Sequence, residues 1–117
     1  MRVVRVDIDV AHPETRPRTV LVLLDDKGWR DVVCGVLQQE GYAVLTARHA
    51  GHALLMCARH EGPIDLLITD EVTPDGRGRT IARTLRAEQP GMRSLLFGRR
   101  PLERDSLLTA VRSALAS

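Results

Sequence analysis

The sequence predicts an α/β fold, in which a mostly parallel sheet lies between two layers of helices. Short apolar runs that suit buried strands alternate with longer segments whose apolar residues recur at helical spacing. Glycine or proline closes most of these helical segments. Acidic residues directly follow two of the runs, at the sheet edge where parallel folds bind ligands. Together these observations favour a three-layer α/β/α domain of the flavodoxin-like kind.

The composition fits one small domain and narrows its partners. The chain has 117 residues, 44% of them hydrophobic, with a net charge of +2 and 3% aromatic residues. So weak a positive charge and so few stacking side chains argue against a nucleic-acid partner. No signal peptide and no membrane-spanning apolar stretch is visible in the sequence. We therefore expect a cytoplasmic protein with no membrane partner, whose two cysteines stay reduced.

The first 18 residues predict a strand and a linker ahead of the main domain, which we place at residues 19–117. Between Val3 and Val10, apolar residues alternate with charged ones, the pattern of a strand with one solvent-facing side. Pro13 and Pro17 then favour a stiff linker.

The elements of the main domain follow in regular alternation, and each strand is a nearly continuous apolar run because both its faces are buried. In chain order we expect strand Thr19–Leu24, a helix from about Trp29 to Gly41, strand Tyr42–Thr46, helix Ala50–His60, a strand around Leu66–Ile68, a helix from about Arg79 to Glu88, strand Ser94–Phe97, and a last helix from near Glu103. The helical spacing places these residues on the buried faces: Trp29, Val32, Val33, Val36 and Leu37; Ala53, Leu54, Cys57 and Ala58; Ile81, Ala82 and Leu85; Leu107, Leu108, Val111, Ala114 and Leu115.

Acidic residues at two strand ends are the candidate site. Asp25 and Asp26 follow the first strand, and Asp70 ends the third. Neighbouring strands are about 4.8 Å apart, so the three carboxylates could converge. Carboxylates that close repel one another unless a hard cation such as Mg²⁺ lies between them. The alternative is that Asp25 and Asp26 only cap the following helix.

At this point the chain resembles the receiver domain of two-component response regulators. The matching features are the acidic pair Asp25-Asp26, then Asp70, Pro74 four residues later, and Gly78. The resemblance implies that Asp70 accepts a phosphoryl group from a histidine kinase or phosphotransfer protein. It also implies that Asp25, Asp26, Asp70 and the backbone carbonyl of Val72 hold Mg²⁺.

The chain departs from the receiver pattern near its end. Receivers carry Ser or Thr where this sequence has Gly98, and Lys before Pro where it has Arg100. Arg100 could contact a phosphoryl oxygen, or it could be only part of a solvated arginine pair. Only Arg99 lies between these positions, so the fourth helix and fifth strand of the family are expected to be absent. Glu71 also adds negative charge where receivers usually have an apolar residue.

Two functions stay open from the sequence. The first is a phosphorylatable receiver with Mg²⁺ as cofactor, and the second is a pseudo-receiver that binds partners without phosphorylation. An enzyme of the phosphatase type is disfavoured by the short chain and the lack of a general acid. We expect output through a downstream protein partner. We also expect that the N-terminal strand covers the exposed edge of the fourth strand of the main domain, with the second strand as the alternative, and that exchange of this strand between copies permits a homodimer.

Overall fold

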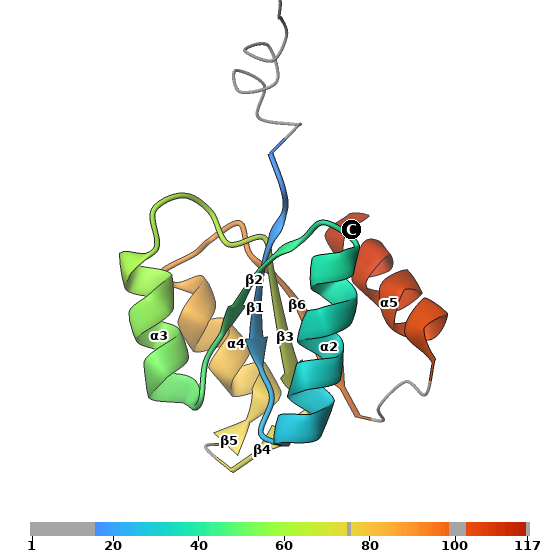
Figure 1. The fold of residues 1–117 in the computed structure, drawn as a ribbon. Helices are drawn as coiled ribbons and strands as arrows, with labels where there is room; N and C mark the ends of the chain where they lie inside the picture. Colours follow the sequence, from blue (N-terminus) through green and yellow to red (C-terminus); the bar gives the residue numbers. More distant parts are fainter. Residues whose placement is uncertain (1–15, 75, 99–102, 117) are drawn as a thin grey trace, which may run out of the picture.

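The computed structural model describes residues 16–74, 76–98 and 103–116, and the predicted parallel sheet is present in them. Its four strands lie in the order β2-β1-β3-β6, all parallel (Figure 1). Their bounds are β1 (Thr19–Leu23), β2 (Ala43–Thr46), β3 (Leu66–Asp70) and β6 (Arg93–Phe97). The chain goes outward from β1 to β2 and then back across β1 to β3 and β6. This reversal of direction brings the carboxyl ends of β1 and β3 side by side.

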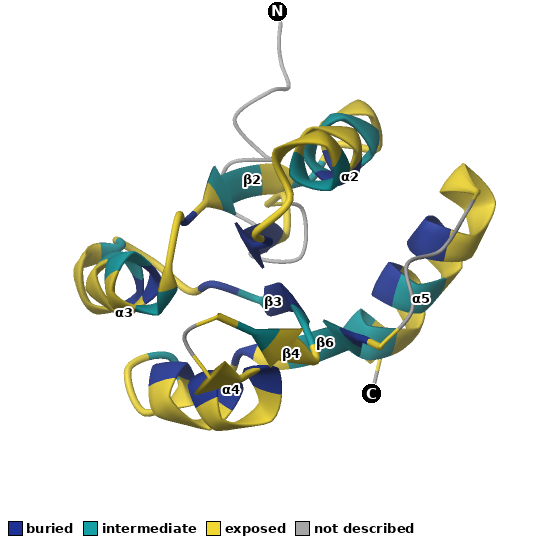
Figure 2. Ribbon diagram, turned by 90° about the horizontal axis from the view of Figure 1, so that it is seen from below, coloured by how far each residue is buried: buried dark blue, intermediate teal, exposed yellow. Residues whose placement is uncertain are grey.

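Two helices cover each face of the sheet, as the sequence predicts (Figure 2). Helices α2 (Lys27–Gln39) and α5 (Arg104–Ala116) pack on one face. Helices α3 (Ala50–Arg59) and α4 (Gly78–Arg86) pack on the other. Because side chains alternate along a strand, β1 contributes Val20 and Val22 to the first layer and Leu21 and Leu23 to the second. Burial on both faces is the physical reason for the continuous apolar run in this strand.

Three residues predicted to be buried are exposed instead. Val32 of α2 is 56% exposed, Leu54 of α3 is 37% exposed, and Ala58 is exposed as well. A helix with the sheet on only one side buries a narrow stripe, here Val33 and Leu37 in α2. The apolar pattern in the sequence is broader than that stripe. The inward residues predicted for α4, in contrast, are all buried.

The sheet is shortened, as expected from the sequence. Only residues 98–103 separate β6 from α5, too few for a further helix and strand, and α5 packs against β6 and α2. Strand β6 is therefore the last strand of the sheet within the described residues. The predicted N-terminal strand, Val3–Val10, lies outside them. In the part of the chain that the structure covers, no helix is long and apolar enough to cross a membrane.

Ion pairs at two places join segments that are distant in sequence. Glu40, after α2, accepts hydrogen bonds from Arg104 (2.6 Å) and Arg112 (3.1 Å) of α5. The hydrogen bond from Arg104 is the main reason that the pKa of Glu40 lies below its ordinary value. Arg16 donates two hydrogen bonds, of 2.9 and 3.1 Å, to the carboxylate of Asp65 ahead of β3. This second contact fixes the chain just before it enters β1.

Candidate functional site

Asp70 is the last residue of β3, at the carboxyl end of the sheet, and it is partly buried. The strand register pairs it with Phe97 of β6, and the next backbone N–H, of Glu71, donates to the Phe97 carbonyl at 3.0 Å. On the other side, Thr69 pairs with Leu23 of β1. The residues that follow β1, Asp25 and Asp26, therefore leave the sheet beside the end of β3, as predicted.

Asp26 caps the helix that follows it. Its Oδ1 accepts a hydrogen bond of 2.9 Å from the backbone N–H of Trp29, and α2 begins at Lys27, two residues before the predicted start. The capping alternative considered from the sequence therefore occurs at this residue. It does not exclude a second role, because a carboxylate has two oxygens and about four acceptor positions.

Asp25 and Asp70 line two different hollows of the surface. Asp25 is exposed and lines a small pocket with Arg48 and His49. Asp70 lines another pocket, of about 320 Å³, with Glu71, Val72, Phe97 and Gly98. Among the residues that the structure describes, no three His, Cys, Asp or Glu side chains are grouped so that they could hold a metal ion. The Mg²⁺ site therefore stays a prediction.

A short hairpin that the sequence pattern did not predict follows Asp70. Strands β4 (Val72–Thr73) and β5 (Gly76–Arg77) pair antiparallel, and the Thr73 hydroxyl donates to the Gly76 carbonyl. Gly76 has φ +136°, a conformation that favours glycine. Pro74 and Gly76, which favour turns, are the residues from which this turn could have been predicted. The hairpin leaves Val72 74% exposed beside the candidate site.

Gly78 is required by its contact with Asp70. Its N–H donates to the Glu71 carbonyl at 2.7 Å, which brings the first residue of α4 against the end of β3. A Cβ added to Gly78 would lie 2.2 Å from the backbone oxygen of Asp70. No side chain fits in this space. The glycine noted in the sequence as part of the receiver pattern thus has a steric function next to the candidate acceptor.

Gly98 lies next to the carboxylate of Glu71. A Cβ added to Gly98 would be 2.8 Å from Glu71 Oε1, too close for a side chain unless Glu71 moves. The position where receivers carry a hydroxyl thus lies against a carboxylate in this chain. The sequence showed both departures separately, but not that they are in contact. The other predicted phosphoryl contact, Arg100, lies outside the described residues.

Thr69 is a further unusual residue at the end of β3. Its side chain is fully buried, and its hydroxyl has no hydrogen-bond partner among the described residues. An unsatisfied buried polar group costs roughly 1–3 kcal/mol. Nothing in the sequence pattern distinguished this threonine from an ordinary strand residue.

Comparisons with known proteins point to one family, although no protein-family model matches the chain. The chain is 34% identical over 82 residues to the probable transcriptional regulatory protein TcrX of Mycobacterium tuberculosis, a match that covers 70% of this chain and 34% of the relative. It is 37% identical over 90 residues to the transcriptional regulatory protein CreB of Escherichia coli, covering 77% of this chain and 38% of the relative. The chain thus spans little more than a third of the length of these relatives.

The solved structures that this chain resembles include receiver domains. The receiver domain of the hybrid histidine kinase CckA superposes with a TM-score of 0.68 and 27% identity, over 83% of this chain and 98% of that one. A CheY-like receiver domain protein from Methanospirillum hungatei gives a TM-score of 0.63 and 27% identity, over 80% and 75% of the two chains. The fold and these neighbours define the class of protein: a receiver domain of the response-regulator type. This chain is a member whose sheet has four strands within the described residues.

Proposed function

We propose that this domain accepts a phosphoryl group on the carboxylate of Asp70 as a step in two-component signalling. In this reaction, the phosphorus–nitrogen bond of a phosphohistidine breaks and a bond from phosphorus to an Asp70 oxygen forms. The donor histidine leaves with its electron pair and takes up a proton. The observation that carries the proposal is the position of Asp70 at the end of β3, partly buried beside the end of β1 and its two aspartates.

Mg²⁺ is part of the proposal. This cation keeps several waters and needs only one or two protein carboxylates besides the phosphate oxygens. Asp26 and Asp70, with the Val72 carbonyl, would hold it, and Asp25 would contribute only if its side chain turned from the hollow that it lines towards Asp70. When bound, it would neutralise charge on the phosphoryl oxygens.

The residues beside Asp70 predict slow phosphorylation and a small conformational response. The negative charge of Glu71, which lines the same pocket as Asp70, opposes a phosphoryl dianion. Gly98 has no hydroxyl that could follow the phosphoryl group. Arg100, two positions after Gly98 in the sequence, carries a positive charge, but its planar guanidinium group differs in shape from a lysine ammonium.

Labelling with acetyl phosphate and Mg²⁺, followed by peptide mass spectrometry, tests the proposal. We expect one phosphoryl adduct on Asp70, and none in Asp70→Asn. Asp26→Asn should slow labelling and weaken Mg²⁺ binding, because the amide oxygen retains the helix cap while the charge is lost. Asp31→Asn is the matched control, since Asp31 is exposed on α2 and pairs with Lys27. An adduct on another residue would contradict the site assignment.

The contact between Glu71 and Gly98 favours a second candidate, a pseudo-receiver that binds its partner without phosphorylation. Glu71→Gln separates the two functions. If Asp70 is an acceptor hindered by charge, this variant should be labelled faster than the wild type. If neither protein is labelled and neither binds Mg²⁺, the pseudo-receiver is the better description.

The partners and location belong to the proposal as well. The phosphoryl donor would be a histidine kinase or a phosphotransfer protein in the cytoplasm, and a downstream protein would read the signal. The proposal also includes self-association into a homodimer.

A further inference from the structure

The outer edge of β6 has a row of backbone groups that face away from the sheet. The N–H of Arg93 donates to the Asp65 carbonyl at 2.9 Å, and the Phe97 carbonyl accepts from Glu71 at 3.0 Å. Alternate residues of a strand bond to the same neighbour, so Leu95 also faces β3. The N–H and C=O of Ser94 and Leu96 point the opposite way, where the described part of the chain has no further strand.

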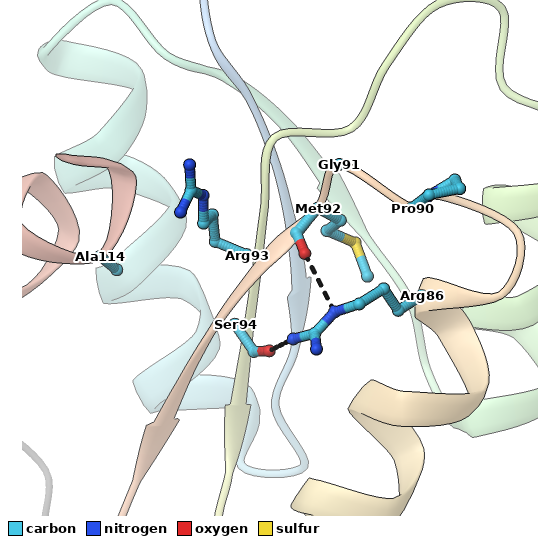
Figure 3. Close-up of a pocket in the computed structure, with 7 residues that line it drawn as sticks. All are labelled: Arg86, Pro90, Gly91, Met92, Arg93, Ser94 and Ala114. Carbon is cyan, nitrogen blue, oxygen red and sulfur yellow. Dashed lines mark hydrogen bonds between the residues drawn. The ribbon is translucent and has the colours of Figure 1, made fainter. Parts of the chain in front are cut away.

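The surroundings of this edge differ on its two faces. Helix α5 packs on one face of β6, where Leu95 joins the core of α2 and α5. At the start of β6 is a hollow of about 500 Å³ lined by Arg86, Met92, Arg93 and Ser94. In Figure 3 the two guanidinium groups lie on opposite sides of the strand. Arg86 donates to the Met92 carbonyl (3.3 Å) and to the Ser94 hydroxyl (2.9 Å). A strand that binds here would meet Leu95 and the guanidinium group of Arg93 on the face of α5, and the guanidinium group of Arg86 on the other face.

We propose that Val3–Val10 of the same chain binds along this edge as a strand antiparallel to β6. Val4, Val6, Ile8 and Val10 would pack towards α5, and Arg5, Asp7 and Asp9, with a net charge of −1, would lie on the side of Arg86. The alternating pattern of this segment suits an edge strand that has α5 on one of its faces. Burial of the open backbone groups of Ser94 and Leu96 would also remove an edge that favours aggregation.

The direction and the choice of edge follow from Arg16. Because Arg16 precedes β1, the segment would approach the amino-terminal end of the sheet at Val10 and would therefore run opposite to β6. The five residues between Val10 and Arg16 span at most about 16–18 Å. A strand outside β6 is three strand spacings from β1, or about 14 Å. The edge of β2 is also within reach, but the paired hydrogen bonds of Arg16 to Asp65 direct the chain towards β3 and β6.

Amide hydrogen exchange of the full chain, measured residue by residue by NMR at low protein concentration, tests this proposal. We expect the amides of Ser94 and Leu96 to be protected, and to exchange roughly tenfold faster or more when residues 1–12 are deleted. The amide of Leu95 is the internal control, because it faces β3 in both proteins. Val6→Pro in the full chain should have the same effect as the deletion without removing the segment. Glu14→Pro, in the linker, is the matched control and should leave exchange unchanged.

Three outcomes would overturn the proposal. The first is equal exchange of Ser94 and Leu96 in the full chain, the deletion variant and Val6→Pro. The second is a loss of protection at Val44 and Thr46 instead, which are the outward-facing amides of β2 and would place the segment on that edge. The third is protection that appears only as a dimer forms with rising concentration, which would make a second copy the source of the strand.

Discussion

Replacement of Gly78 by alanine tests the contact between α4 and the end of β3. The added methyl group would lie 2.2 Å from the Asp70 oxygen, whereas real Cβ contacts are essentially never shorter than 3.0 Å. The chain must therefore open by about 0.8 Å, the difference between these distances. The obstructing atom belongs to the backbone, so no side-chain rotation can relieve the clash. The hydrogen bond from Gly78 N–H to the Glu71 carbonyl, now 2.7 Å, would weaken as the two segments separate.

The expected cost combines overpacking with the weakened hydrogen bond. Overpacking of this kind costs about 1–3 kcal/mol, and a typical hydrogen bond contributes about 1 kcal/mol. We therefore expect Gly78→Ala to lower the free energy of unfolding by about 2–4 kcal/mol. At about 4 °C per kcal/mol, the melting temperature should fall by about 8–16 °C. Urea denaturation and thermal melting followed by circular dichroism would measure both quantities.

Gly35→Ala is the matched control. Gly35 lies inside α2, and a Cβ added there would meet no atom within 4 Å. Alanine is favoured over glycine inside a helix by about 0.5–1 kcal/mol, so this variant should be more stable than the wild type. If Gly78→Ala were as stable as the wild type while Gly35→Ala behaved as expected, the close packing of α4 on Asp70 would be wrong.

Three further predictions concern single contacts. Burial raises the pKa of Asp65, but hydrogen bonds from Arg16 and the Thr19 N–H outweigh burial and lower it below the ordinary value. A lowered pKa in the folded state means that this stabilisation is complete above the ordinary carboxyl range and is lost as pH falls through the folded value. The urea midpoint should therefore fall less steeply with acidification in Asp65→Asn than in the wild type, and parallel pH profiles would contradict this. Asp26→Ala should destabilise by about 0.5–2 kcal/mol through loss of the α2 cap, and Asp26→Asn by clearly less; equal losses would argue against the cap. Thr69→Val should be neutral or stabilising by up to about 1 kcal/mol, since it removes an unsatisfied buried hydroxyl of similar size, and a marked loss of stability would reveal a hidden partner.

The sequence by itself determined the class of fold and the elements that carry the site. A strand between two helix layers must be apolar on both faces, so the continuous apolar runs of β1 and β3 predicted these strands from the sequence alone. The position of Asp70 after such a run, with Asp25 and Asp26 after another, predicted that all three lie at one edge of the sheet. The shortened connection before α5 was also visible, because it depends only on the number of residues.

The tertiary structure alone decided which residues meet at that edge. Glu71 and Gly98 are 27 positions apart, and only the register of β3 with β6 brings the carboxylate against the glycine. The contact of Gly78 with the Asp70 carbonyl depends in the same way on how α4 returns to the sheet. The exposure of Val32 was also not predictable, because periodicity shows which residues share a helix face but not how much of that face a neighbour covers. Distances between segments depend on packing, which a local pattern of residues does not contain.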